Sequence, residues 1–221
     1  AEAGAKISYN PNAVFACKMI LKVEPPSIEE IKMINPQSIL FSAMQIKTQK
    51  KEYYEALALK RVTAVAFEYI QDTHGFFPIV KSLSEIAGIA SVLIASELMN
   101  NLNEGNGLLL GNISGVPPSK VLIIGAGTVG EFAARSAMGL GANIEVFDNS
   151  LTKLRNLQHK LGYPIATSTI QPKVLSDSLK RCDVAIGALR GRTRTPVVVT
   201  EDMVRNMKEG AVIIDVSIDN G

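Results

Sequence analysis

A glycine fingerprint between a predicted strand and a predicted helix constrains this chain most. The apolar run 121–124 leads into Gly125, Gly127 and Gly130, which have the spacing G-x-G-x-x-G. The first glycine permits a tight turn, the second lets the backbone approach a pyrophosphate, and the third lets the helix pack closely on the strand. Free N–H groups at the start of the helix attract the phosphate charge. The pattern therefore predicts a dinucleotide-binding unit and disfavours an ordinary glycine turn.

An acidic residue follows the next predicted strand. Asp148 comes directly after residues 143–147 and lies 18 residues after Gly130. Its carboxylate would accept hydrogen bonds from the ribose hydroxyls of an adenosine. It would repel a 2′-phosphate, and the neighbouring Asn149 and Ser150 supply no guanidinium to offset that repulsion. We therefore expect the cofactor to be NAD in preference to NADP.

Composition and charge narrow the class of protein. The chain has 221 residues, 47% of them hydrophobic, which is enough for one large or two modest domains. A net charge of +2 gives no strong field for nucleic acid or an anionic membrane, so neither is an expected partner. The two cysteines, Cys17 and Cys182, are far apart in the sequence, which favours a reducing, cytoplasmic setting. We expect both chain ends to be cut ends of a segment from within a longer protein.

Neither a membrane-spanning segment nor a metal site is expected. The apolar stretch 86–98 is too short to span a bilayer, which argues against membrane insertion. His74 and His159 have no cysteine, aspartate or histidine at ligand spacing, which argues against a metal site.

Strands and helices alternate along two parts of the chain, which predicts parallel sheets. In the first part we expect strands at 19–23, 38–42 and 63–67 and helices at 27–34 and 48–60. In the second part we expect strands at 121–124, 143–147, 164–166, 183–187 and 211–215 and helices at 129–140, 151–161, 172–180 and 201–207. Between the two parts, Ser82 begins a capping-box pattern for a helix over about 82–101.

These patterns predict an α/β fold with two domains. Residues 107–221 would form a doubly wound parallel-sheet Rossmann domain that binds NAD, because its strands are near-continuous apolar runs. Residues 1–100 would form part of a second α/β domain, the N-terminal substrate domain, with the helix at about 82–101 as the connector.

Five segments of the chain together resemble the family of alanine dehydrogenases and NAD(P) transhydrogenase alpha subunits. They are residues 20–25, 84–88, 125–130 with Asp148, 183–188, and 215–221, where Asp215 to Gly221 is similar to a D-x-x-x-D-Q-G segment. The resemblance implies an NAD-dependent oxidoreductase that converts L-alanine to pyruvate and ammonia. Its substrate would be a small amino acid or 2-oxo acid. We also expect a homo-oligomer.

Two catalytic positions of alanine dehydrogenases hold other residues here. Glu24 stands where the resemblance places a carbonyl-binding lysine, and Gln45 stands where it places a base histidine. Glutamine cannot act as a general base at neutral pH. Lys22, roughly 6 to 7 Å from residue 24 on the same strand face, is either a replacement catalytic lysine or a solvated one. A transhydrogenase-like or non-catalytic NAD-binding protein is therefore the alternative, although the Arg-Gln-Asp loop of transhydrogenases is also absent from residues 73–83.

Other candidates have a functional and a structural interpretation. By resemblance, Asp219 is an active-site aspartate or a turn-capping one, Lys153 contacts the ribose or is solvated, and Ser84 lies near the cofactor or starts a helix. Glu68 faces the substrate or forms a salt bridge, and the basic run 190–196 touches a phosphate or a carboxylate, or is a solvated loop. The predicted cofactor-binding residues are Ser84, Gly125, Gly127, Thr128, Val129, Gly130, Asp148, Lys153 and Leu189. The predicted catalytic residues are Asp219 and Lys22.

Overall fold

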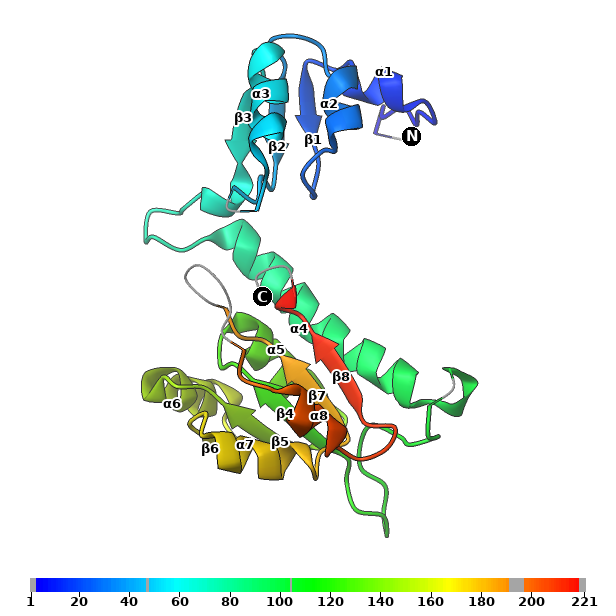
Figure 1. Ribbon diagram of the computed structural model, residues 1–221, viewed down its shortest axis with the longest axis vertical. Helices are drawn as coiled ribbons and strands as arrows, with labels where there is room; N and C mark the ends of the chain where they lie inside the picture. The colour runs from blue at the N-terminus through cyan, green and yellow to red at the C-terminus, as the bar shows by residue number, and fades with distance from the viewer. Residues whose placement is uncertain (1–2, 47, 104, 191–196, 219–221) are drawn as a thin grey trace. The chain divides into compact units, whose positions relative to one another are not determined.

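The structure is a computed structural model that describes residues 3–46, 48–103, 105–190 and 197–218. The chain divides into two compact units, Ala1–Val80 and Lys81–Gly221. Each unit contains a parallel sheet with helices packed on it (Figure 1). The predicted α/β fold class, with a Rossmann-like second part, is confirmed.

The first unit is built on a parallel sheet with the strand order β1-β2-β3. Its elements are α1 (Pro11–Phe15), β1 (Met19–Leu21), α2 (Ile28–Met33), β2 (Ile39–Ser42), α3 (Lys51–Leu59), β3 (Thr63–Ala66) and the 3₁₀ helix η1 (Phe67–Tyr69). Ile20 and Leu40 are paired in the sheet and pack with Ile31 of α2 and Leu57 of α3 in one buried cluster. The three expected strands and two expected helices are present, and α1 was not predicted.

A capping box starts α2. The Ser27 hydroxyl accepts a hydrogen bond from the Glu30 N–H at 3.1 Å, and the Glu30 carboxylate accepts one from the Ser27 N–H at 2.7 Å. Two N–H groups that lack a helical partner are thereby satisfied. The local sequence therefore defines where this helix begins.

The second unit is built on a parallel sheet with the strand order β6-β5-β4-β7-β8. Its elements are α4 (Pro78–Met99, which begins in the last residues of the first unit), η2 (Asn101–Asn103), β4 (Lys120–Ile124), α5 (Thr128–Gly139), β5 (Asn143–Phe147), α6 (Leu151–Leu161), β6 (Ala166–Ser168), α7 (Pro172–Leu179), β7 (Val184–Gly187), α8 (Glu201–Arg205) and β8 (Val212–Asp215). The chain proceeds outward from β4 to β6 on one side and then returns to β7 and β8 on the other. The sheet is doubly wound, and its topological switch point lies between β4 and β7.

Helices cover both faces of this five-stranded sheet. Val121 and Ile123 face one side, where α4, α5 and α6 contribute Val92, Ala133 and Leu154 to a shared core. Leu122 and Ile124 face the other side and pack with α7 through Leu175 and Leu179. Successive strand residues point to opposite faces, so a continuous apolar strand is buried on both sides. This arrangement leaves the strand ends as the places where ligands can bind.

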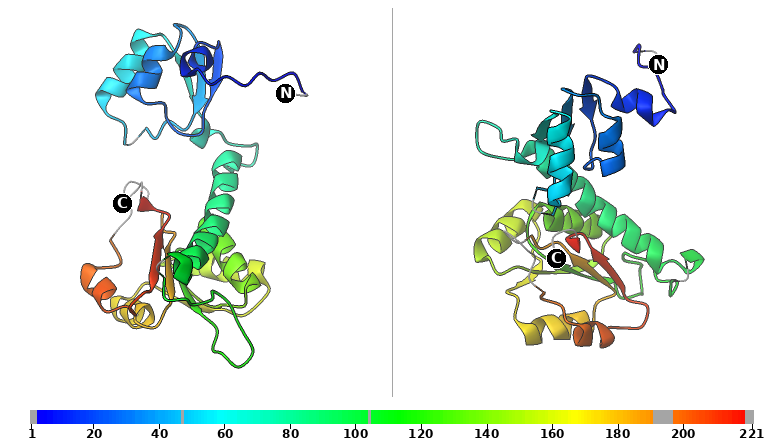
Figure 2. Two further views of the ribbon diagram at one scale, coloured as in Figure 1. Left: turned by 90° about the vertical axis from the view of Figure 1, so that its right-hand side faces the viewer. Right: turned by 45° about the horizontal axis from the view of Figure 1, so that its top comes forward.

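Helix α4 differs from its prediction. It begins at Pro78, not at Ser82, so the expected capping box at Ser82 is wrong. Proline suits the first turn of a helix because its φ is preset and it has no N–H to leave unpaired. Figure 2 shows α4 as one uninterrupted helix.

The length argument against a membrane span was made on the stretch 86–98 and does not hold for the whole of α4. Its 22 residues are long and apolar enough to cross a bilayer, with a mean hydropathy of 1.6 over the most apolar window. Length and composition are weak evidence for a membrane span, since a helix that packs in the core of a soluble protein passes the same test. One face of α4, including Gly88, Val92 and Met99, is buried.

Strand β6 begins at Ala166, two residues later than the start predicted at residue 164. Proline at position 164 has no N–H to donate to a neighbouring strand. The register is instead set by pairing with β5, where Glu145, Val146 and Phe147 face Ala166, Thr167 and Ser168.

An ion-pair cluster joins α5 to α6. The Glu131 carboxylate lies 2.6 Å from Lys160 Nζ and 3.0 Å from Arg135 Nη2. Burial raises the pKa of Glu131, but the hydrogen bonds from Lys160 and Arg135 outweigh it and hold that pKa below its ordinary value. The cluster keeps Glu131 charged in the first turn of α5 and fixes α6 beside it.

Candidate cofactor and substrate sites

The glycine loop lies at the carboxyl end of β4, between the ends of its two neighbouring strands. The Gly125 N–H donates to the Phe147 carbonyl at 2.7 Å, and the Ala188 N–H donates to the Ile124 carbonyl at 2.8 Å. This position at the switch point of a doubly wound sheet is where ligands bind in such folds.

Gly125 and Gly130 have no space for a side chain. A Cβ on Gly125 would lie 2.4 Å from the Ala188 carbonyl oxygen, and Gly125 has a φ of +123°. A Cβ on Gly130 would lie 1.8 Å from the Gly125 carbonyl oxygen. Both glycines therefore permit close approaches of the backbone that any other residue would prevent.

Gly127 is different because its surroundings are open. No atom lies within 4 Å of a Cβ built there, and its φ of −85° suits any residue. Gly127 is the N-cap of α5, and no side chain caps that helix. An open surface at a helix N-terminus is suited to a phosphate group, because the backbone can approach the anion there. The residues therefore fit a dinucleotide.

Asp148 is buried at the carboxyl end of β5 and is bound to the glycine loop. Its Oδ2 accepts a hydrogen bond from the Ala126 N–H at 2.9 Å, and its Oδ1 accepts one from the Ser150 N–H at 2.8 Å. A carboxylate offers about four acceptor positions, so capacity remains for ribose hydroxyls. The hydrogen bond from Ala126 therefore fixes the position of Asp148 relative to the glycine loop.

Two residues close to Asp148 make further contacts at the carboxyl end of β5. Lys153 Nζ lies 3.8 Å from Asp148 Oδ2, so the two predicted ribose-binding residues are neighbours. Asn149 Oδ1 accepts a hydrogen bond from the Ile170 N–H at 3.1 Å and so joins the β5–α6 turn to the segment after β6. No spacing in the sequence indicated the Asn149 contact or the bond from the Ala126 N–H to Asp148.

The remaining predicted cofactor residues also belong to the second unit. Ser84 lies one turn before Gly88 on α4, and a Cβ on Gly88 would be 2.5 Å from the Val129 carbonyl oxygen of α5. Residues four apart share a helix face, so Ser84 is on the face of α4 that meets α5. Leu189 follows β7, and its backbone nitrogen lies 2.9 Å from where a Cβ on Gly125 would be. Their contact with a cofactor remains a prediction.

Glu24 and Gln45, where the resemblance places a catalytic lysine and a catalytic histidine, lie at the carboxyl edge of the first sheet. The Lys22 N–H donates to the Phe41 carbonyl at 3.0 Å, and the Ala43 N–H donates to the Val23 carbonyl at 3.2 Å. These bonds continue the pairing of β1 with β2 beyond the strands. Glu24 and Gln45 therefore follow neighbouring strand ends, and both are exposed.

Lys22 has a structural partner in this sheet. Its Nζ lies 3.5 Å from Glu30 Oε2, the oxygen that accepts the Ser27 N–H in the capping box. The ammonium thus stabilises the start of α2. This contact supports the structural interpretation of Lys22 over the catalytic one.

Glu68 makes a backbone contact that was not among the roles expected for it. Its Oε1 accepts hydrogen bonds from the Met44 and Gln45 N–H groups, both at 2.8 Å. The side chain therefore connects the end of β3 to the segment after β2. No spacing in the sequence indicated this contact.

Two predictions lie outside the described residues. They are the active-site role of Asp219 and the contacts of residues 191–196 in the basic run. Arg190, the first residue of that run, is exposed.

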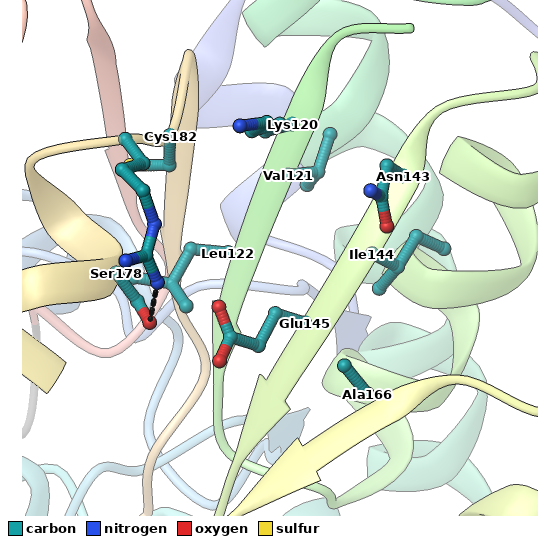
Figure 3. Close-up of a pocket in the computed structure, with 10 residues that line it drawn as sticks. Lys120, Val121, Leu122, Asn143, Ile144, Glu145, Ala166, Ser178 and Cys182 are labelled. Atoms are coloured by element: carbon teal, nitrogen blue, oxygen red, sulfur yellow. Dashed lines mark hydrogen bonds between the residues drawn. The ribbon is translucent and has the colours of Figure 1, made fainter. Parts of the chain in front are cut away.

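A cavity of about 250 Å³ lies at the opposite end of the second sheet, lined by the first residues of β4 and β5 and by the end of α7 (Figure 3). Burial, together with the nearby Asp183 carboxylate, raises the pKa of the Cys182 thiol in its wall to about 11. That thiol is protonated and unreactive at neutral pH. The cavity is distinct from the glycine loop, which lies at the carboxyl ends of the same strands.

Comparison with known proteins gives the same family over both units. Residues 1–87 match the model of the alanine dehydrogenase/PNT N-terminal domain, and residues 91–221 match that of the C-terminal domain. An alanine dehydrogenase of Staphylococcus epidermidis is 36% identical over all 221 residues, which span 59% of that relative. An alanine dehydrogenase 2 of Staphylococcus aureus has the same identity and coverage.

Solved structures agree with this similarity. An L-alanine dehydrogenase matches with a TM-score of 0.87 and 30% identity, over 100% of this chain and 61% of its own. A transhydrogenase from Sinorhizobium meliloti shares the fold, with a TM-score of 0.81 and 23% identity, over 100% of this chain and 64% of its own. The chain thus spans about three fifths of the length of its relatives, and it belongs to the alanine dehydrogenase/PNT family.

Proposed function

We propose that this protein is an NAD-dependent oxidoreductase that converts a small L-amino acid, such as L-alanine, to a 2-oxo acid and ammonia. The observation that carries the proposal is the open glycine loop at the start of α5, held to a buried acid, Asp148. The similarity to alanine dehydrogenases over the whole chain supports the choice of substrate.

The cofactor follows from the family and from the residues present. The family is NAD(H)-dependent, which confirms the cofactor predicted from the fingerprint. Gly127 and the first turn of α5 would bind the pyrophosphate, and Asp148 with Lys153 would bind the adenosine ribose. NAD, when bound, accepts the hydride from the substrate.

The substrate side of the proposal rests on the first unit. We propose that residues 1 to about 100 act as the substrate domain and that residues 107–221 bind NAD, in a cytoplasmic homo-oligomer. The exposed residues at the carboxyl edge of β1 and β2 would then contact the amino acid. With Glu24 and Gln45 there, neither a carbonyl-binding lysine nor a base histidine is present at these two positions.

The absence of a lysine and a histidine from these two positions supports a second candidate function. A non-catalytic or transhydrogenase-like protein would retain the glycine loop and Asp148 without needing the lysine and the histidine. Such a protein would bind NAD and oxidise no amino acid.

An assay of NAD reduction by the full-length protein, with a panel of L-amino acids, separates the two candidates. We expect slow reduction of NAD with small aliphatic amino acids and none with large ones. The control is binding of NAD by calorimetry in the same preparation. Intact NAD binding without oxidation of any amino acid would favour the second candidate.

The NAD preference gives a further prediction at Asp148. Replacing Asp148 with alanine should weaken NAD binding by about 1 to 3 kcal/mol, because hydrogen bonds to a charged acceptor are lost. The discrimination against NADP should shrink as well, since no carboxylate then repels the 2′-phosphate. Calorimetric titration with both cofactors measures both effects.

Asp148 also accepts two backbone hydrogen bonds, so a folding control is needed. Asp148→Asn retains the shape and one acceptor oxygen while it removes the charge, and thermal unfolding of both variants shows whether the fold is intact. Equal affinity of the unmodified protein for NAD and NADP would contradict the assigned role of Asp148.

A further inference from the structure

Gln45 has an unusual backbone conformation at the carboxyl edge of the first sheet. Its φ is +46°, in the left-handed region that residues other than glycine seldom adopt. Two other such residues occur in the described chain, Gln37 with φ 64° and Arg61 with φ 51°. Those two lie at the opposite edge, in turns that enter β2 and β3, and each donates its N–H to a main-chain carbonyl. The Gln45 N–H instead donates to a side chain, the carboxylate of Glu68.

The backbone of Gln45 is held on both sides. Its N–H donates to Glu68 Oε1 at 2.8 Å, and its carbonyl accepts from the Thr48 N–H at 2.9 Å and from Thr48 Oγ1 at 3.0 Å. Strained conformations persist where the surrounding structure over-determines them, and they concentrate at functional sites. The contact from Glu68 comes from a different element, η1, after the neighbouring strand.

Glu68 makes this contact at a cost. Its Oε2 is buried and has no hydrogen-bond partner among the described residues. A buried carboxylate oxygen without a partner is unfavourable, and such an atom requires an explanation in a native structure. The arrangement is explained if the position of the Gln45 side chain, which is exposed, matters for function.

We propose that Gln45 contacts the substrate through its side-chain amide and that Glu68 is the positioning residue that fixes the Gln45 backbone. The amide offers two donors and an acceptor, so it can donate to the carbonyl or carboxylate oxygen of a small 2-oxo acid. It can also accept from the amino group of the corresponding amino acid. This proposal rests on the proposed function, in which the exposed residues at the carboxyl edge of β1 and β2 contact the amino acid.

The test measures binding of pyruvate to the full-length protein with NADH present, together with hydrogen exchange of the Met44 and Gln45 amides. In Glu68→Ala, exchange at these amides should become faster and pyruvate affinity should fall by about tenfold, the effect of one hydrogen bond. NADH affinity should not change. Glu68→Gln retains an oxygen that accepts both N–H groups, so it should restore slow exchange and pyruvate affinity. Gln45→Ala should lose pyruvate affinity to a similar degree.

Asn10→Ala is the matched control, because it removes the side-chain cap of α1 in the same unit and lies before β1, away from this edge. It should lower the unfolding temperature and leave both readouts at residues 44 and 45 unchanged. Faster exchange in Glu68→Ala with unaltered pyruvate affinity would overturn the proposal, since the contact would then be structural only. If the unmodified protein bound NADH but no pyruvate, the proposed function itself would fail, and the Gln45 contact with it.

Discussion

Replacing Gly127 with valine is expected to abolish NAD binding while the second unit stays folded. No atom lies within 4 Å of a Cβ at this position, and the φ of −85° suits valine, so the fold tolerates the side chain. The same open space is where a pyrophosphate approaches the backbone. We expect a loss of at least about 100-fold in affinity, which corresponds to about 3 kcal/mol. Calorimetry with NAD measures the affinity, and circular dichroism checks the fold.

Two further glycines of α5 provide controls. Gly139, at the other end of the helix, also has nothing within 4 Å of a Cβ, so Gly139→Val should fold and bind NAD normally. Gly130→Val should fail to fold, because its Cβ would lie 1.8 Å from the Gly125 carbonyl oxygen. If a folded Gly127→Val variant retained NAD affinity, the fingerprint would be only a structural turn.

Placing a lysine at position 24 and a histidine at position 45 together is expected to raise the rate of L-alanine oxidation more than either substitution alone. The unmodified protein should oxidise L-alanine slowly, since a missing general base lowers the rate by a factor of about 10² to 10⁴. Glu24→Lys combined with Gln45→His should recover a large part of that factor. Histidine is tolerated better than most residues at a positive φ, such as the +46° of residue 45. The measurement is the initial rate of NAD reduction with L-alanine.

The two substitutions should be strongly non-additive. Binding the carbonyl and moving the proton serve one transition state, so each single variant should gain much less than half of the logarithmic effect. Glu52→Lys with Gln37→His makes the same two changes away from this strand edge, and Gln37 also has a positive φ, of 64°. This pair should leave the rate unchanged. Rapid oxidation of L-alanine by the unmodified protein would show that Glu24 and Gln45 do not limit catalysis.

Elements with strong local signals were predicted well from the sequence. Helix α6 spans Leu151–Leu161 as expected, because Ser150 caps its start and Gly162 adopts a φ of 64° at its end. Both capping signals act within a few residues. In contrast, the start of β6 was predicted two residues early. Its register depends on pairing with β5, and the sequence of β6 alone carries no information on that partner.

The chemistry of the cofactor site was also determined by the sequence, because it depends on local spacing. The glycines of a tight turn and the acid after the next strand have the same meaning in any strand-turn-helix unit of this kind. The substitution of Glu24 and Gln45 for catalytic residues was equally visible. None of these conclusions required knowing which groups meet across the fold.

Only the tertiary structure distinguished among residues of the same type and revealed contacts between distant ones. It showed that Gly127 is open while Gly125 and Gly130 are closed, since that depends on neighbouring strands and loops. It also joined Asp148 to the Ala126 N–H and Glu68 to the Gln45 N–H, which are 22 and 23 residues apart. A hydrogen bond to a backbone N–H is not encoded in the type of the residue that donates it. Such contacts therefore leave no pattern in the sequence, and they are decided when the parallel strands bring their carboxyl ends together.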